Sequence, residues 1–313
     1  MTGRSPSVLI LGGTGFIGRA LISFLLTEGF SVTALVIPSR GQQGRLSDIP
    51  GLSFLTTSSS ESADLTTALG GKQFDTIINL AAAGVRPDER SARNLYDGNI
   101  GFLLNILSAV SKAPPRLFIQ TGSWFEYRQT LEPTPITESH SLLTLSIYGS
   151  AKAASYIMGT ASAYSLRIPF VCLRLFHVYG PGEPQHRLIP YMQQQLIEGK
   201  TVNLSSGKQL RDFTYLTDVL EAYKAAILTP TITAHPVYNV CTGTPNTVRK
   251  MCETVADTLG APKSLLKFGA AQNRDDESDW GIGDSTLFQG VTGWRPQIGI
   301  QVGVKNTIEA LSR

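Results

Sequence analysis

Short apolar runs rich in β-branched residues alternate with longer stretches of helical spacing through the first half of the chain. Alternation of this kind predicts a parallel sheet with helices on both faces. The predicted strands are residues 7–11, 31–37, 52–55, 76–80, 116–120 and 170–174, and the most prominent predicted helices cover residues 93–111 and 148–163. The pattern therefore predicts an α/β fold built on a Rossmann-type doubly wound parallel sheet.

The pattern changes near residue 176, where Gly- and Pro-rich loop sequence replaces the regular alternation. We expect a first domain over residues 1–175 with a returning segment near 211–242. A smaller C-terminal α/β domain is expected over residues 176–210 and 243–313. Residues 212–219 and 238–240 are predicted to be strands or turns that return to the first sheet.

The composition is that of a globular protein and narrows the classes of partner. The chain has 313 residues, of which 42% are hydrophobic and 16% charged, so it can bury a substantial core. A net charge of +3 without a basic run argues against nucleic acid as a partner. Because no apolar stretch approaches the roughly 20 residues that span a bilayer, no membrane partner is expected either.

Cysteine usage points to a reducing compartment. Cys172, Cys241 and Cys252 are odd in number and lack the spacing of metal ligands. We therefore expect neither a disulfide framework nor a metal site. The N-terminal residues lack the apolar segment of a signal peptide, and a cytoplasmic location is the expectation.

A glycine-rich turn lies between the first predicted strand and a helix-like stretch. Residues 12–18 read Gly-Gly-Thr-Gly-Phe-Ile-Gly. Glycines allow a sharp turn and close backbone approach, and the N–H groups at a helix start favour phosphate. The turn predicts a dinucleotide pyrophosphate site, although glycine turns also serve merely to join strands to helices. The candidate cofactor-binding residues here are Gly12, Gly15, Phe16, Ile17 and Gly18.

A phenol and an ammonium lie four residues apart at Tyr148 and Lys152, which places them on one face of a helix. A nearby cation favours the phenolate, so a tyrosine can then transfer protons near neutral pH. The alternative is an exposed helix pair with no chemical role. Thr121 and Ser123, at the end of the fifth predicted strand, add two hydroxyls at the edge where a ligand would lie.

In this order the motifs resemble the extended short-chain dehydrogenase/reductase family, in the branch that acts on nucleotide-activated sugars. The resemblance covers nearly the whole chain. It rests on residues 12–18, Asn79-Leu80-Ala81-Ala82, Asn99, Ser123 with Tyr148 and Lys152, residues 174–182, residues 211–219 and residues 238–240. It implies that residues 1–175 bind the dinucleotide, with Leu80, Ala81 and Ala82 beside it, and that the smaller domain binds the substrate.

The resemblance also implies the roles of the reacting residues. Ser123 precedes Tyr148 by 25 positions, the separation usual in this family, and would hydrogen-bond the reacting sugar oxygen. Tyr148 would be the general acid or base. Lys152 would hold the nicotinamide ribose and lower the pKa of the tyrosine. Thr121 is the second candidate for the catalytic hydroxyl.

Three further residues are candidate substrate contacts by the same resemblance. Arg211 resembles the arginine that grips a substrate diphosphate, for which a guanidinium fork is suited; a salt bridge to Asp212 is the alternative. Arg274 would be a second diphosphate contact. His177 stands where relatives carry an asparagine that contacts the substrate, and a hydrogen-bonded loop histidine is its alternative role.

The chain departs from the family in two segments, one that bears on the reaction and one that bears on adenine binding. Sugar-nucleotide dehydratases carry an Asp-Glu pair after the catalytic hydroxyl, whereas this chain has Trp124-Phe125, with Glu126 one residue later. Elimination of water by that route is therefore not expected. At residues 57–61 the usual Asp beside the adenine is also missing, so a serine hydroxyl or a backbone group would replace it.

The end of the second predicted strand bears on the choice of cofactor. An acidic residue there binds the ribose hydroxyls of NAD, whereas basic residues accommodate the 2′-phosphate of NADP. Residues 36–40 contain no acid and offer Ser39 and Arg40. Arg19 and Arg45 are expected nearby. The sequence thus favours NADP(H), with NAD as the less favoured cofactor.

The leading hypothesis is NADPH-dependent reduction of a 4-keto sugar attached to a nucleoside diphosphate, with Tyr148 as the general acid. An epimerase that keeps its NAD(P) bound is the alternative, and a noncatalytic NADP-binding regulator is a third, less favoured hypothesis. Relatives of this family usually form homodimers through the helices that contain Asn99 and Tyr148. Tyr156, Ile157, Ala161 and Tyr164 could belong to such a face, although core packing would explain them equally well.

Overall fold

The computed structural model describes residues 5–38, 41, 43–129, 133–144, 146–272 and 278–311. The chain forms two compact units. The first consists of Met1–Arg128, Ser141–Arg174 and Tyr223–Tyr238, and the second of Gln129–His140, Leu175–Ala222 and Asn239–Arg313. The segment that rejoins the first unit is thus shorter than the predicted 211–242, and residues 129–140 belong to the second unit.

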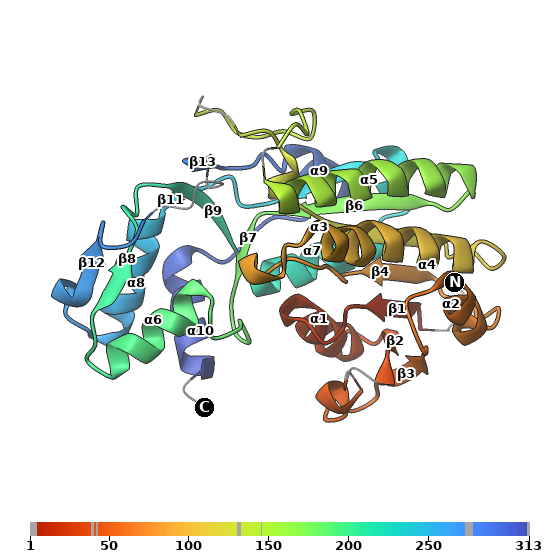
Figure 1. Ribbon diagram of the computed structural model, residues 1–313, viewed down its shortest axis with the longest axis horizontal. Helices are drawn as coiled ribbons and strands as arrows, with labels where there is room; N and C mark the ends of the chain where they lie inside the picture. Colours follow the sequence, from red (N-terminus) through yellow and green to blue (C-terminus); the bar gives the residue numbers. More distant parts are fainter. Residues whose placement is uncertain are drawn as a thin grey trace. The chain divides into compact units, whose positions relative to one another are not determined.

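A seven-stranded sheet carries the first unit, in the strand order β10-β6-β5-β4-β1-β2-β3. Figure 1 labels β6, β4, β1, β2 and β3 of this sheet. The strands are β1 (Ser7–Leu11), β2 (Ser31–Val36), β3 (Ser53–Thr56), β4 (Thr76–Asn79), β5 (Leu117–Ser123), β6 (Phe170–Leu175) and β10 (Val237–Val240). The neighbours β3, β2, β1, β4 and β5 run parallel. All six strands predicted in the first half exist, and the predicted Rossmann-type fold is confirmed. Because the order turns back between β1 and β4, their carboxyl ends meet at the edge where such sheets bind ligands.

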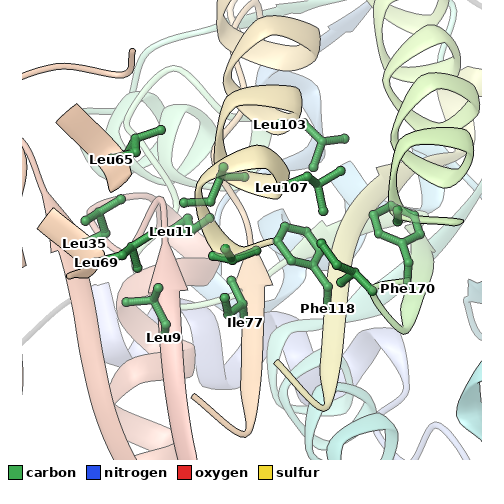
Figure 2. Packing of buried hydrophobic residues seen from close by; sticks show 14 of the residues in the cluster. Leu9, Leu11, Leu35, Leu65, Leu69, Ile77, Leu103, Leu107, Phe118 and Phe170 are labelled. Atoms are coloured by element: carbon green, nitrogen blue, oxygen red, sulfur yellow. The ribbon is translucent and has the colours of Figure 1, made fainter. Parts of the chain in front are cut away.

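Helices cover both faces of this sheet. They are α1 (Phe16–Thr27), α2 (Ser62–Leu69), α3 (Ala92–Leu95), α4 (Phe102–Val110), α5 (Ile147–Ser165) and α7 (Leu216–Leu228). Figure 2 shows Leu65 and Leu69 of α2 and Leu103 and Leu107 of α4 packed over alternate strand residues such as Leu11. On the other face Lys224 of α7 pairs with Glu28 after α1, at 2.9 Å. The strands therefore alternate between two buried layers, which explains their continuous apolar runs.

The helix predicted over residues 93–111 is interrupted. A π-helical turn, Tyr96–Gly101, separates α3 from α4. Within it, Asn99 donates side-chain hydrogen bonds to the carbonyl oxygens of Leu95 and Ala83, at 3.0 and 3.2 Å. π-Helical turns are rare in proteins, but those that occur often lie at functional sites.

The second unit has its own sheet and its own core. Strands β7 (His177–Tyr179), β9 (Leu210–Tyr215), β11 (Pro245–Thr247) and β13 (Trp280–Gly281) form the sheet, and β8 (Val202–Leu204) pairs with β12 (Leu266–Phe268). Helices α6 (Leu188–Ile197), α8 (Val248–Leu259) and α10 (Ile300–Leu311) pack together (Figure 1), and α9 (Thr286–Thr292) completes the unit. Buried Met192, Val255 and Val304 connect the three packed helices.

One predicted segment lies in a different sheet. Residues 238–240 do join the first sheet within β10, as predicted. The prediction that residues 212–219 return to that sheet is wrong, because β9 pairs with β7, β11 and β13 and is followed directly by α7. The reason is visible at Asp212, whose buried carboxylate accepts hydrogen bonds from backbone N–H groups of Thr242, Gly243 and Gly283. These contacts fix β9 within the second unit.

Candidate active site

The glycine turn after β1 brings three backbone segments into close contact. Gly12 has φ +79°, and a Cβ there would lie 2.5 Å from the Ala81 nitrogen and 2.7 Å from the Leu80 carbonyl carbon. A Cβ on Gly18 would overlap the Gly12 carbonyl oxygen, so the first turn of α1 also packs against this turn. Both positions require glycine.

The start of α1 has the features that bind an anion. Gly15 is its N-cap, and no side chain caps this helix within the described residues. The N–H groups of Phe16, Ile17 and Gly18 belong to the first turn, where a helix has no intrahelical acceptor for them. A dinucleotide pyrophosphate fits this arrangement of open amides, positive dipole end and glycine backbone. The residues of this turn therefore remain the candidates for binding the pyrophosphate.

Replacing Gly12 with alanine is expected to lower both the melting temperature and the affinity for the dinucleotide, NAD(P)(H). A non-glycine residue at this φ costs about 1–2 kcal/mol, and the new methyl group would also displace the backbone at Ala81. The matched control is Gly290→Ala on α9, since Gly290 is not among the glycines with positive φ and a Cβ there would meet nothing within 4 Å. Calorimetry and fluorescence titration measure both effects. Wild-type stability and cofactor affinity in Gly12→Ala would contradict this account of the turn.

Two asparagines hold the loop that follows β4. Asn79 accepts a hydrogen bond from the Ala81 N–H (3.1 Å) and donates one to the Gln120 side chain (2.9 Å). Asn99 accepts from the Ala83 N–H at 3.3 Å. Because Gly12 packs against the backbone of Leu80 and Ala81, this loop has a fixed distance from the glycine turn. The predicted cofactor contacts Leu80, Ala81 and Ala82 therefore adjoin the predicted pyrophosphate site.

The start of α5 is pressed against the turn that follows β5. Ser146 caps the helix by accepting from the Gly149 N–H, at 3.3 Å. A Cβ on Gly149 would overlap the carbonyl oxygen of Phe125. The rings of Phe125 and Tyr148 meet edge to face, with their centroids 5.9 Å apart. The structure thus brings the predicted residue Tyr148 to the turn that begins at Ser123.

Lys152 lies one helical turn after Tyr148 and is only 3% exposed. Its ammonium donates to the backbone carbonyl oxygen of Thr121, at 2.6 Å. Burial lowers the pKa of Lys152, and the charge of nearby Glu126 opposes this decrease. The lysine is therefore held by the end of β5 on the face of α5 that carries Tyr148.

The two candidate hydroxyls have different surroundings. The Thr121 hydroxyl shares a hydrogen bond of 2.6 Å with the buried hydroxyl of Tyr223. Ser123 is half-buried, and its hydroxyl oxygen accepts from the Phe125 N–H at a longer 3.3 Å. The strong partner of Thr121 favours Ser123 as the hydroxyl that meets a ligand.

Glu126 has a structural environment that the sequence did not reveal. Its carboxylate is fully buried and accepts from the Ser123 backbone N–H at 2.7 Å and from Arg174 Nε at 2.6 Å. A buried carboxylate already paired in this way is not placed to exchange protons with a substrate. The structure therefore gives no support to Glu126 as a dehydratase acid.

Arg90 lies beside the reaction centre and was not predicted. Its guanidinium carbon lies 5.3 Å from the centroid of the Tyr148 ring, and its Nε donates to the Gly84 carbonyl oxygen at 3.0 Å. A guanidinium over a phenol ring interacts with the ring face and favours the phenolate form. The one signal for Arg90 in the sequence is that a basic residue occurs in the loop after the fourth predicted strand.

In the second unit, Arg211 and His177 lie on paired strands. His177 of β7 is in register with Phe213 of β9, two residues after Arg211. The pKa of His177 is held well below its usual value by burial and by the positive charges of Arg211 and Arg187. A neutral imidazole is therefore expected here near pH 7. Arg187, a second guanidinium close to His177, is a residue that the sequence reasoning missed.

The alternative roles of Arg211 and His177 can be compared with their contacts. Among the described residues no ion pair joins Arg211 to Asp212, whose carboxylate instead binds the loop at Thr242. Arg211 is buried, with 3% of its surface exposed, and donates to the Leu210 carbonyl oxygen at 2.9 Å. The predicted contacts Ser39, Arg40 and Arg274 lie outside the described residues. The described residues contain no cluster of potential metal ligands and no helix that could cross a membrane.

A Rossmann sheet with a glycine turn, together with a serine on β5 and a Tyr-Lys pair on α5, defines the short-chain dehydrogenase/reductase class. The chain matches the model of the NAD dependent epimerase/dehydratase family over residues 8–241, and it belongs to that family. This confirms the resemblance to extended short-chain dehydrogenases/reductases.

Individual relatives cover nearly the full length. The chain is 31% identical to a dTDP-6-deoxy-L-talose 4-dehydrogenase (NAD(P)(+)) from Kitasatospora kifunensis, over 97% of this chain and 95% of that protein. It is 26% identical to a CDP-abequose synthase from Salmonella typhimurium, over 99% and 100%. The structure of a UDP-glucuronic acid 4-epimerase from Bacillus cereus, solved with UDP-glucuronic acid and NAD, has the same fold, with a TM-score of 0.85, 20% identity and coverage of 98% and 99%. The homologues are NAD(P)-dependent nucleotide-sugar epimerases, dehydrogenases and reductases, so the prediction of an enzyme of this kind is confirmed.

Proposed function

We propose that the protein reduces the 4-keto group of a nucleoside-diphosphate sugar with NADPH. The observation that carries this proposal is that the residues on either side of Ser123 contact α5: the Thr121 carbonyl oxygen accepts from Lys152, and the Phe125 ring meets the Tyr148 ring. When bound, the cofactor supplies the hydride. Similarity to a 4-dehydrogenase supports position 4, since oxidation of a 4-hydroxyl is the reverse of this reduction.

The side chains divide the remaining work of the reaction. Hydride addition to a carbonyl builds negative charge on the oxygen, so the site must supply a proton there. Tyr148 donates that proton, and Ser123 hydrogen-bonds the same oxygen and orients it. Lys152 holds the nicotinamide ribose, and its positive charge favours the phenolate that Tyr148 becomes. Thr121 positions Lys152 through its carbonyl oxygen.

The second unit is proposed to bind the substrate. Arg211 would grip the diphosphate with its guanidinium fork, and Arg187 adds positive charge close to His177. His177, neutral near pH 7, would then offer the sugar or a phosphate oxygen a hydrogen bond without adding charge. Arg274 remains a proposed second diphosphate contact.

NADPH is the proposed reductant on the basis of the second strand. Residues 36–40 lack the acidic residue that binds NAD, and Ser39 and Arg40 would meet the 2′-phosphate. Arg19, near the start of α1, is paired with Asp48 and donates to the Arg45 carbonyl oxygen at 2.6 Å, so its charge is already compensated and the choice rests on residues 36–40. The name of the Kitasatospora relative, which includes NAD(P)(+), is compatible with this choice.

Epimerisation at the same carbon is the second candidate, because the same three residues could oxidise a sugar and return the hydride to its other face. The fold similarity to a 4-epimerase is compatible with this second candidate. The two functions differ in their cofactor balance. A panel of dTDP- and CDP-linked 4-keto-6-deoxy sugars, assayed for NADPH loss at 340 nm, detects a reductase; the corresponding 4-hydroxy sugar nucleotides, assayed for their 4-epimers, detect an epimerase, which consumes no NADPH.

The active form is proposed to be a homodimer that pairs through α5. Ile157 and Tyr164 of that helix are 56% and 87% exposed, and Ala161 lies between them on the same face. Tyr156 faces inward and stacks on Arg174, so it does not belong to this face. We expect wild-type protein to elute at twice the chain mass of 33.8 kDa.

Replacing Ile157 with glutamate is expected to convert the dimer to a monomer, because a charge in a buried apolar interface is unfavourable. Light scattering coupled to size exclusion measures the mass directly. Val302→Glu is the matched control, since Val302 is an equally exposed apolar residue on α10. A monomeric wild-type protein, or a dimer that survives Ile157→Glu, would exclude this interface.

A further inference from the structure

One buried carboxylate lies at the end of β5, where Lys152 is also held: the Lys152 ammonium donates to the Thr121 carbonyl oxygen at 2.6 Å, and a Cβ on the next residue, Gly122, would lie 2.7 Å from Glu126 Oε1. Glu126 Oε1 accepts from the Ser123 backbone N–H (2.7 Å), and Ser123 Oγ accepts from the Phe125 N–H (3.3 Å). These reciprocal bonds close the turn Trp124–Glu126 as a capping box. The same Glu126 charge acts on Lys152 and raises its pKa against the effect of burial.

Arg174 holds the other side of this carboxylate. Its Nε donates to Glu126 Oε2 at 2.6 Å, and one terminal nitrogen donates to the Tyr127 hydroxyl at 2.9 Å. The guanidinium carbon lies 4.6 Å from the ring centroids of both Tyr127 and Tyr156. Arg174 thus joins β6, the turn after β5 and helix α5. Glu126 and Arg174 are almost completely buried, so solvent screens their charges little.

The turn is shaped for this carboxylate. A Cβ on Gly122 would lie 2.7 Å from Glu126 Oε1, 2.7 Å from Cys172 Sγ and 3.0 Å from Arg174 Cγ. Glycine at this position is what lets the glutamate fold back beneath Ser123. The contact is therefore built into the end of β5 and does not depend on a flexible surface side chain.

We propose that Glu126 is a positioning residue for the reaction: it orients Ser123 through its backbone and serves as the counter-charge that keeps Lys152 protonated. This inference rests on the proposed function of Ser123, Tyr148 and Lys152. Arg174 balances Glu126, so the buried group comprises two cations and one anion. Formation of the Tyr148 phenolate neutralises the remaining positive charge.

Other titratable groups surround this cluster. They are Tyr127 on the turn, Cys172 on β6, Tyr148 and Tyr156 on α5, Tyr223 on α7, and Arg90 over the Tyr148 ring. Burial raises the pKa values of Cys172, Tyr156 and Tyr223, so these three groups stay neutral through the working range. A change of charge at Glu126 or Arg174 should therefore shift the pKa values of Lys152 and Tyr148.

The sign of each expected shift follows from charge. Glu126→Gln keeps an oxygen acceptor for the Ser123 N–H but removes the negative charge, which lowers the pKa values of both Lys152 and Tyr148. The alkaline limb of kcat in the reduction direction should then move down by roughly one pH unit. Arg174→Gln removes a positive charge and should move the same limb up. In the double variant Glu126→Gln/Arg174→Gln the limb should lie between the two.

The experiment is a pH profile of kcat for wild type and these three variants, with thermal unfolding of each. Substrate KM should stay within about twofold, because neither residue is proposed to touch a ligand. Glu126→Ala, which also removes the acceptor of the Ser123 N–H, should lower kcat at every pH. If Glu126→Gln fails to fold because Arg174 loses its partner, the comparison is made between Arg174→Gln and the double variant. The alkaline limb of the double variant should then lie at lower pH than that of Arg174→Gln.

Superimposed profiles, or shifts of the same sign in Glu126→Gln and Arg174→Gln, would overturn the proposal. A wild type that reduces no 4-keto sugar nucleotide would instead refute the proposed function. In that event the pH dependence of NADPH binding, measured by fluorescence, takes the place of kcat because Lys152 is the ribose contact. The same order of shifts supports the role of Glu126, and identical binding profiles overturn it.

Discussion

Replacing Tyr148 with phenylalanine is expected to lower kcat by about 10²–10⁴-fold, the usual contribution of a positioned general acid. The hydroxyl is the only group removed, so the ring contacts with Phe125 and Arg90 remain. Because Lys152 and the glycine turn are unchanged, affinity for NADPH should stay close to that of wild type. Stopped-flow measurement of NADPH oxidation and a fluorescence titration give the two quantities.

The matched control for this variant is Tyr191→Phe, which removes a phenol hydroxyl from a partly exposed position on α6. Its kcat should stay within about twofold of wild type. Unchanged turnover in Tyr148→Phe would remove the tyrosine from the mechanism. A noncatalytic cofactor-binding protein would show no turnover in wild type and equal NADPH affinity in both variants.

Replacing Arg211 with glutamine is expected to raise the substrate KM by roughly 10- to 150-fold, because hydrogen bonds to charged groups contribute about 1.5–3 kcal/mol. The effect on kcat should be much smaller, since the diphosphate is bound equally in the ground and transition states. Steady-state kinetics with varied sugar nucleotide measures this division between KM and kcat.

Two comparisons sharpen the test of Arg211. Arg211→Lys keeps one charge but loses the planar fork, so its KM should fall between wild type and Arg211→Gln. Arg295→Gln, an exposed arginine of the same unit, should leave KM unchanged. An Arg211→Gln enzyme with wild-type KM would show that the diphosphate is held elsewhere.

The sheet could be predicted because its strands are buried on both faces. Residues 8–11, for example, form a continuous apolar run, and the strand predicted around it, residues 7–11, has the same bounds as β1. The glycine turn could also be predicted, since Gly12 and Gly18 lie where only glycine fits the backbone. Tyr148 and Lys152 were proposed from their spacing on one helix face, whereas the role of Ser123 was inferred from the resemblance to the family.

Contacts between distant positions could not be read in the same way. Glu126 and Arg174 are 48 positions apart, and neither residue type reveals that the two form a buried pair. The π-helical turn at Asn99 follows from hydrogen bonds to Ala83, which a helical pattern does not encode. Arg90 lies in a loop, where hydrophobic periodicity carries no information.

The error at residues 212–219 has the same origin. The alternation of apolar and polar residues identifies a strand there but does not name its neighbours. The neighbours of β9 are set by the Asp212 carboxylate, which binds the backbone of three residues distant in sequence. Choice of sheet is thus a tertiary property, whereas choice of strand is largely local.

The most direct test of the account is a stoichiometric assay of purified wild-type protein with NADPH, using the panel of 4-keto sugar nucleotides and, in parallel, their 4-hydroxy counterparts. One molecule of NADPH should be oxidised for each molecule of 4-hydroxy sugar nucleotide formed, and Tyr148→Phe should lose this reaction. Conversion of a sugar nucleotide to its 4-epimer without NADPH loss would contradict reduction as the function.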